Sequence, residues 1–173
     1  GLDGGTEQGL MGEDGAVEFR KGGISVTPFV LMNGQLVTWA DVELKQSLQD
    51  GYLPIPSVDW KHPDFDLRVT SFIRGDENQS QMLVRYKLKN TGTTEQDFTL
   101  ALAAQPWQVN PPTQFLSTQG GVSPVRFMAL NLGGDLMADP VGTVHGSLDS
   151  LNAVARTLQP ADATLVTRFD EGI

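Results

Sequence analysis

The chain has 173 residues, of which 21 are acidic and 12 are basic, and its formal net charge is −9. This length suits a single domain whose core is large enough to need no covalent cross-link. A negative chain repels a polyanion such as DNA at long range, so the charge argues against a nucleic-acid partner. The chain has no cysteine, which excludes disulfides and thiolate metal sites. No apolar run approaches the roughly 20 residues that span a bilayer, so we expect no membrane span.

The N-terminal part divides into a lead-in and a first strand. Residues 1–15 are expected to form a flexible lead-in, because they carry six glycines and four acidic residues among few large apolar ones. Residues 16–20 then alternate, with Val17 and Phe19 on one face and Glu18 on the other. A period of two predicts a short strand.

Two longer strands are expected next, joined by a hairpin. Ile24–Met32 is rich in Val, Ile and Phe and contains Pro28, which cannot donate to a ladder. We therefore expect this strand to lie at an edge of the sheet or to contain a bulge. Asn33–Gly34 predicts a two-residue hairpin turn, and the following strand is expected to run from Gln35 towards Leu48.

The middle of the chain predicts a turn, a brief strand and a meander. Gly51–Pro56 carries two prolines and is expected to be a turn, followed by a brief strand over Ser57–Trp60. Phe65–Ile73, Gln81–Lys89 and Gln96–Trp107 alternate strongly and predict three consecutive antiparallel strands paired in sequence order. The side chains expected to face the core are Phe65, Leu67, Val69, Ser71, Met82, Val84, Tyr86, Leu88, Phe98, Leu100 and Leu102.

The last part predicts a hairpin, a helix and a final apolar stretch. Val125–Leu132 and Asp135–Ala138 flank a double glycine and are expected to pair. A short helix is expected from Asp149 or Ser150 to Leu158, because its apolar residues fall on one stripe. The sequence thus predicts an all-β protein, an antiparallel β-sandwich or supersandwich with one short helix near the C-terminus. Residues 16–173 are expected to form one domain of a larger protein, since the chain lacks an initiator Met and ends without a domain-closing signal.

The histidines and carboxylates of the sequence form no recognisable catalytic or metal-binding motif. His62 and His145 are expected in loops, and neither has a second ligand at a zinc spacing. Glycoside hydrolysis needs two facing carboxyl groups, whereas Asp41 and Glu43 are expected on the solvated face of a strand. We therefore assign no catalytic residue, no metal ligand and no cofactor. A pair of acid–base histidines acting on a sugar ring stays open as an alternative.

Aromatic and amide side chains suggest a saccharide site. Gln105 precedes Trp107, and Gln108 and Asn110 follow it. Two consecutive prolines come directly after Asn110 and make the segment rigid. Indole faces stack on the CH faces of sugar rings, and amides bind hydroxyls. The candidate carbohydrate-binding residues are Gln105, Trp107, Gln108, Asn110, Trp39 and Tyr52. The alternative is that Trp107 closes the end of the sandwich and the amides satisfy backbone groups of a turn.

Three stretches carry a resemblance to a known family: Thr38–Val42, Tyr52–Val58 and Ala104–Pro112. Over residues 24–173 the chain resembles the β-sandwich region of large bacterial proteins that are often labelled as discoidin type or coagulation factor 5/8 type. In those proteins a galactose-mutarotase-like supersandwich accompanies an (α/α) toroid related to glycoside hydrolases.

The resemblance implies a non-catalytic, carbohydrate-associated domain of a larger glycan-processing enzyme. Its partners would be carbohydrate and the toroid of the same protein, which supplies the general acid, and the parent protein would be periplasmic or secreted. One alternative is a self-contained mutarotase or epimerase, in which His62 and His145 meet a carboxylate in one cleft. Another is a structural interaction module of a cell-envelope protein, which would expose an apolar patch.

Overall fold

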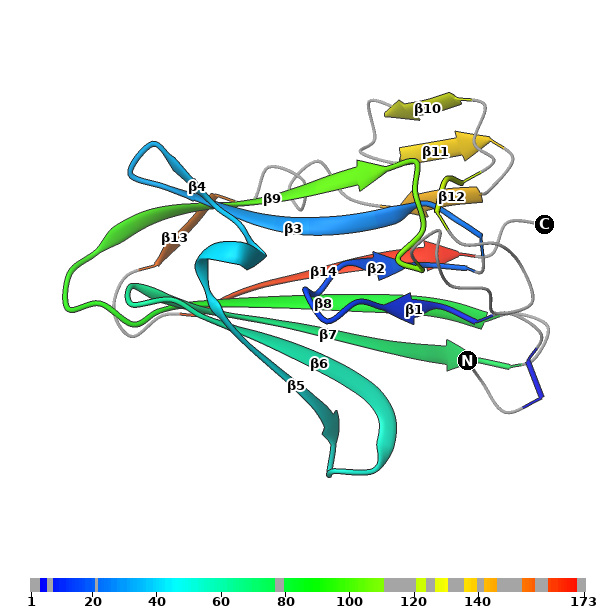
Figure 1. The fold of residues 1–173 in the computed structure, drawn as a ribbon, viewed down its shortest axis with the longest axis horizontal. Coiled ribbons are helices and arrows are strands. Elements are labelled where there is room, and N and C mark those ends of the chain that lie inside the picture. Colours follow the sequence, from blue (N-terminus) through cyan, green and yellow to red (C-terminus); the bar gives the residue numbers. More distant parts are fainter. Residues whose placement is uncertain are drawn as a thin grey trace.

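The computed structural model describes residues 4–5, 8–20, 22–76, 80–110, 121–123, 127–130, 136–139, 142–145, 154–157 and 162–170. Two antiparallel sheets face each other across one apolar core (Figure 1). The predicted all-β sandwich is therefore confirmed. Within these ranges no helix is long and apolar enough to cross a membrane.

The smaller sheet has six strands in the order β1-β2-β3-β9-β13, with β4 paired to β3. Its strands are β1 (Leu10–Met11), β2 (Val17–Glu18), β3 (Ser25–Met32), β4 (Gln35–Val37), β9 (Gln96–Gln105) and β13 (Val154–Thr157). A 3-10 turn, η1 (Trp39–Asp41), leads from β4 to the larger sheet.

The larger sheet has eight strands in the order β10-β11-β12-β14-β8-β7-β6-β5. Its strands are β5 (Glu43–Gln49), β6 (Leu53–Lys61), β7 (Phe65–Gly75), β8 (Ser80–Asn90), β10 (Phe127–Leu130), β11 (Leu136–Asp139), β12 (Gly142–His145) and β14 (Asp162–Asp170). The long strands β7 and β8 are neighbours inside this sheet and extend under the smaller sheet (Figure 1).

The core is made by alternate side chains of these strands, as the sequence predicts. The predicted inward residues of β7, β8 and β9 are buried, apart from Leu102, which is partly buried against the core. Phe65 of β7 and Phe98 of β9 meet edge to face, with ring centroids 5.7 Å apart. Burial of one such aliphatic or aromatic side chain stabilises the fold by about 1.5–3 kcal/mol.

The predicted three-strand meander is wrong in its last strand. β7 pairs with β8, but β8 pairs next with β14, whereas β9 crosses to the other sheet and pairs with β3 and β13. Asn90 organises the crossing, because its Nδ2 donates to the Thr94 carbonyl (2.8 Å) and its Oδ1 accepts from the Gly92 N–H (2.8 Å). Alternation shows which side chains face the core, but it does not show which sheet a strand joins.

The predicted edge position or bulge of the strand containing Pro28 is also wrong. β3 is an inner strand, and its register with β9 is unbroken from Ser25 to Met32. On its other side, β2 pairs only as far as Val26 and β4 begins to pair at Val30. Pro28 lies in the gap between these two partners, where a missing N–H breaks no ladder.

The hairpin predicted at Asn33–Gly34 is confirmed, with φ values of 51° and 73° that fit a type I′ turn. The strand expected from Gln35 to Leu48 is wrong as one element, because η1 divides it into β4 and β5. The turn expected over Gly51–Pro56 is shorter than predicted, and both prolines lie in β6. A register shift at Leu48 accommodates them.

The C-terminal hairpin is confirmed by the pairing of β10 with β11, although its glycine turn lies outside the described residues. The predicted helix is wrong at Val154–Thr157, which form β13 and pair with residues 96–99 of β9. β-Branched residues at both ends of this segment fit an edge position on the sheet, and that pairing overrides a weak helical stripe. The rest of the predicted helix lies outside the described residues.

The described end of the expected lead-in is part of the smaller sheet. β1 pairs with β2, and the Gly12 N–H donates to the Ala16 carbonyl (2.8 Å). The indole N–H of the buried Trp60 donates to the Asp14 carbonyl (2.8 Å). Gly15 has a φ of +89°, which favours glycine at this turn. Residues 10–15 are thereby attached to both sheets.

Candidate functional site

A pocket of about 390 Å³ lies where the β1–β2 turn, η1 and the segment after β9 meet. Its walls come from segments that are far apart in the sequence, between Gly12 and Val109. Four of the six predicted carbohydrate-binding residues line it: Trp39, Gln105, Trp107 and Gln108. The structure therefore brings most of the predicted group together, at a place that strand alternation does not specify.

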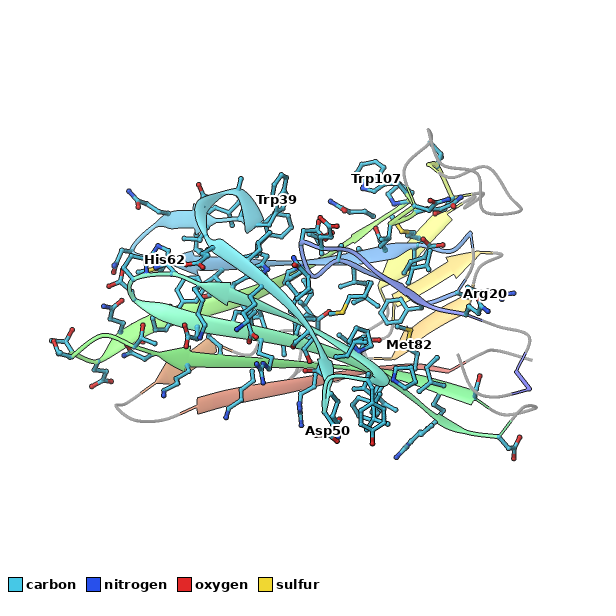
Figure 2. The ribbon with its side chains drawn as sticks, turned by 60° about the horizontal axis from the view of Figure 1, so that its bottom comes forward. Arg20, Trp39, Asp50, His62, Met82 and Trp107 are labelled. Carbon is cyan, nitrogen blue, oxygen red and sulfur yellow. The ribbon has the colours of Figure 1, made fainter. Side chains whose placement is uncertain are left out.

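Two half-exposed tryptophans line this pocket. Trp39 is 50% exposed and Trp107 is 49% exposed, which is unusual for side chains of this size. Figure 2 shows both indoles on the same rim of the molecule, Trp39 on η1 and Trp107 beyond the end of β9. Each therefore offers an indole surface to solvent at the pocket.

Gln105 fixes the indole of Trp107. Its Oε1 accepts two hydrogen bonds, from the Trp107 indole N–H and from the Thr27 hydroxyl, both at 2.9 Å. The Trp107 N–H is thus used inside the protein, and the ring contributes its face. With its oxygen occupied, Gln105 keeps the two hydrogens of Nε2 as donors, and no hydrogen bond to them is found among the described residues.

Trp39 is held by the capping box of η1. The Asp41 carboxylate accepts from the backbone N–H and from the hydroxyl of Thr38, both at 2.8 Å. The Thr38 hydroxyl in turn accepts from the Ala40 N–H at 3.2 Å. The two Thr38 hydrogen bonds lower the pKa of Asp41 below its ordinary value. This carboxylate therefore shapes the turn that presents Trp39.

The segment after β9, residues 106–110, is held on one side by residues 121–123. Trp107 forms an isolated bridge with Val122, and the Gln108 N–H donates to the Gly121 carbonyl at 2.6 Å. The Ser123 N–H donates to the Pro106 carbonyl at 3.0 Å. These backbone contacts give the Trp107 segment a fixed position without regular sheet structure.

On its inner side the same segment contacts Glu18. This side chain is 0% exposed, and its carboxylate accepts from the Gly22 N–H (2.7 Å) and the Val109 N–H (2.9 Å). Burial raises the pKa of Glu18 above its ordinary value, although the backbone N–H groups act in the opposite direction. The short strand predicted over residues 16–20 is confirmed as β2, and Val17, Glu18 and Phe19 are all buried, so both faces of this segment are covered.

The acidic and hydroxyl residues of the pocket were not predicted from the sequence. Glu13 and Asp14 line it from the β1–β2 turn, and Ser25 and Thr27 line it from β3. No lysine, arginine or histidine is among the described lining residues. A turn between two very short strands leaves no periodic signal, so nothing in the spacing singles out Glu13 and Asp14.

Two predicted binding residues lie elsewhere. Asn110 is only 7% exposed, and its Oδ1 is buried with no hydrogen-bond partner among the described residues. Tyr52 is 74% exposed at the turn between β5 and β6 and does not line the pocket. Asp50, at the same turn, lies on the opposite side of the molecule from Trp39 and Trp107 in Figure 2.

His62 has a structural environment. Its ring stacks on Phe65 with centroids 4.7 Å apart, and its Nδ1 accepts from the Asp64 N–H at 3.2 Å. It lies in the turn between β6 and β7, as predicted, and does not line the pocket. The packing on Phe65 is sufficient to explain its half-buried position.

The predicted loop position of His145 is wrong, because this residue is in β12. The register carries it across β14 and β8 to Phe72 of β7, which is seven residues along the strand from Phe65. At about 3.3 Å per residue this separation is roughly 23 Å. The backbone thus places the two histidines towards opposite ends of the larger sheet.

Two carboxylates of the larger sheet, Asp59 on β6 and Asp66 on β7, form ion pairs. Asp59 forms a bidentate ion pair with Arg68 at 2.6 and 2.7 Å, which raises the pKa of that guanidinium. Asp66 pairs with Lys61 at 2.6 Å. The described part of the chain contains no group of three or more residues suited to hold a metal ion.

Comparison with protein-family models, with curated proteins and with solved structures finds no match. Of the predicted family likeness, the described residues confirm the architecture alone: two facing antiparallel sheets with very little helix. On its structure the chain is a two-sheet antiparallel β-sandwich.

Proposed function

We propose that this chain is a carbohydrate-binding β-sandwich domain that acts as a non-catalytic accessory of a larger glycan-processing enzyme. The observation that carries the proposal is the pair of half-exposed tryptophans, Trp39 and Trp107, on one pocket with the amide of Gln105. The bacterial glycoside-hydrolase setting is supported only by the family resemblance of the sequence.

The pocket has the chemistry that a sugar ring requires. Indole faces pack against the CH faces of a pyranose, and the surface they offer is rigid and amphipathic. The Gln105 amide supplies donors, while Glu13 and Asp14 supply acceptors for hydroxyl groups. The volume of about 390 Å³ falls in the range of small-molecule sites.

Charge favours neutral or amino-bearing saccharides over uronic or sulfated ones. The described lining contains two carboxylates and no basic side chain, and the whole chain carries a net charge of −9. An anionic sugar would enter this field without a cation to pair with, at a cost in free energy.

Binding is better supported than hydrolysis. Glycoside hydrolysis requires two carboxyl groups on opposite sides of the scissile bond, about 5 to 10 Å apart. Glu13 and Asp14 are neighbours in one turn, and Asp14 Oδ1 already accepts from the Ala16 N–H at 3.0 Å. A mutarotase mechanism with His62 and His145 loses support, because the register separates these residues.

An interaction module has weaker support. The exposed leucines Leu31 and Leu36 pair on the β3–β4 hairpin, whereas Leu48 and Tyr52 lie around the β5–β6 turn. These two regions lie on different sides of the molecule (Figure 1). Scattered apolar side chains are normal on a protein surface and do not define a docking patch.

The proposal is tested by calorimetric titration of neutral, amino-bearing and acidic oligosaccharides. We expect saturable binding of a neutral or amino-bearing sugar, and a loss of about tenfold or more in affinity for Trp39→Ala and for Trp107→Ala. Tyr52→Ala is the matched control, an exposed aromatic residue outside the pocket, and should bind as the wild type does. Absence of binding to every saccharide, or an equal loss in Tyr52→Ala, would overturn the proposal.

A further inference from the structure

Among the described residues, Glu18 is the acidic side chain with no exposed surface. No described basic side chain forms an ion pair with it. The other buried carboxylate, Asp59, has Arg68 as its partner. A carboxylate without a cation remains buried only where hydrogen bonds replace its hydration. The hydrogen-bond donors around Glu18 therefore indicate its structural role.

Its two oxygens join two segments that are far apart in the sequence. Oε1 accepts from Gly22, in the β2–β3 turn, and Oε2 accepts from Val109, which is 91 residues away from Glu18. The backbone N–H groups of Gly23 and Asn110 also stabilise the charged form. Hydrogen bonds to an ionised acceptor are about twice as strong as neutral ones.

The segment held in this way is a wall of the pocket. Val109 lines the pocket and is two residues beyond Trp107. Ser123 adds a second connection between the same parts, because its hydroxyl donates to the Gly23 carbonyl and its N–H donates to the Pro106 carbonyl. The β2–β3 turn and the tryptophan-bearing segment therefore form one hydrogen-bonded unit with Glu18 inside it.

We propose that Glu18 is a positioning residue of the pocket: its carboxylate fixes residues 106–110 and thereby sets the orientation of Trp107 and Gln108. The inference rests on the proposed function for its meaning, but the positioning itself is measurable without a ligand. Glu18 contacts no bound sugar in this account, since it is fully enclosed and is not a lining residue.

The first test neutralises the carboxylate with little change of shape, as Glu18→Gln. The amide keeps an acceptor for one N–H but points a donor at the other. We expect Trp107 to become more accessible to acrylamide and saccharide affinity to fall about tenfold, while the strand circular dichroism is retained. Quenching is read in a Trp39→Phe background, in which Trp107 is the remaining exposed tryptophan because Trp60 is 0% exposed.

Asp59→Asn is the matched control, since it also neutralises a buried carboxylate but lies on β6, away from the pocket lining. It should leave both Trp107 quenching and sugar affinity unchanged. Wild-type quenching in Glu18→Gln, or an equal effect in Asp59→Asn, would overturn the inference. If the wild type binds no saccharide, the quenching result still decides the positioning role, so the two proposals fail separately.

A second measurement needs no variant that must fold. Amide exchange in the wild-type protein should show the Val109 and Gly22 N–H groups protected together, because one carboxylate accepts a hydrogen bond from each of them. The Thr93 amide, in an exposed loop, serves as the unprotected reference. Exchange of Val109 as fast as that of Thr93, or loss of protection at Val109 alone, would contradict a carboxylate that joins the two segments.

Discussion

Two carboxylates hold the two tryptophans, and they do so in opposite environments. Asp41 is exposed, and its hydrogen bonds with Thr38 lower its pKa, so its contribution to stability is present above its ordinary pKa and is lost as the pH falls. Glu18 is buried, and desolvation raises its pKa. Its effect on stability therefore has the opposite dependence on pH.

The way in which the free energy of unfolding changes with pH should show that folding raises the pKa of Glu18. A folded-state pKa above the unfolded value means that the folded chain binds more protons, so stability is present below the ordinary pKa and is lost as the pH rises through the folded pKa. We expect the free energy of unfolding of the wild type, minus that of Glu18→Gln, to decrease over this window. Urea denaturation at a series of pH values measures it, and a difference that increases with pH would contradict the assignment.

The crossing from β8 to β9 is the decisive connection at the scale of elements. It moves the chain from the larger sheet to the smaller one, and so places Gln105 and Trp107 beside β3 rather than beside β8. Asn90 is buried at the corner and satisfies both ends of its amide within the loop. The position of the pocket thus depends on a turn that lies far from it.

Replacing Asn90 with Ala should destabilise the fold by about 1–3 kcal/mol, because the loop loses two side-chain hydrogen bonds in a buried place. Thr93→Ala, in the same loop but exposed, should change stability by less than about 0.5 kcal/mol. Chemical denaturation compares the two variants. Equal stabilities would show that the Asn90 amide does not organise the crossing.

At the scale of the molecule, one core joins both sheets. Phe65 comes from the larger sheet and Phe98 from the smaller one, and both are fully buried. Their edge-to-face contact contributes about 0.5–1.5 kcal/mol beyond the burial of their area. The sheets should therefore unfold together.

Phe98→Ala should cost about 3–5 kcal/mol and keep a single unfolding transition. Leu36→Ala, at an exposed position of the β3–β4 hairpin, is the control and should have little effect. Fluorescence and far-UV circular dichroism followed through one denaturation would separate the possibilities. Two transitions, or equal costs for the two variants, would contradict a shared core.

The sequence predicts which face of each strand points to the core better than it predicts which strands pair with one another. Alternation identifies the inward residues of β7, β8 and β9, because one side of each strand meets the core. It cannot tell that β9 crosses sheets or that β13 replaces a helix, since both depend on pairing with distant strands. Glu18 breaks the pattern for the same reason: its partners are backbone N–H groups that only the folded chain brings together.

The sequence predicts which types of residue make up the candidate site, but it does not predict how the fold arranges them in space. Tryptophan among amides points to Gln105, Trp107 and Gln108, and Trp39, which the sequence also proposed, reaches the same pocket through η1. The same reasoning included Tyr52 and Asn110, which the structure places outside the pocket. Residue type indicates what a side chain can bind. The turn at η1 and the loop after β9 determine which side chains line the same pocket.

The most direct test of the central claim is a saccharide titration followed by the indole N–H signals of Trp39 and Trp107 in NMR spectra. We expect both signals to shift with one common, saturable dissociation constant for a neutral or amino-bearing oligosaccharide, while the ring signals of Tyr52 stay in place. No saturable shift with any saccharide, or shifts at Tyr52 without shifts at the two tryptophans, would contradict a sugar-binding pocket between η1 and the end of β9.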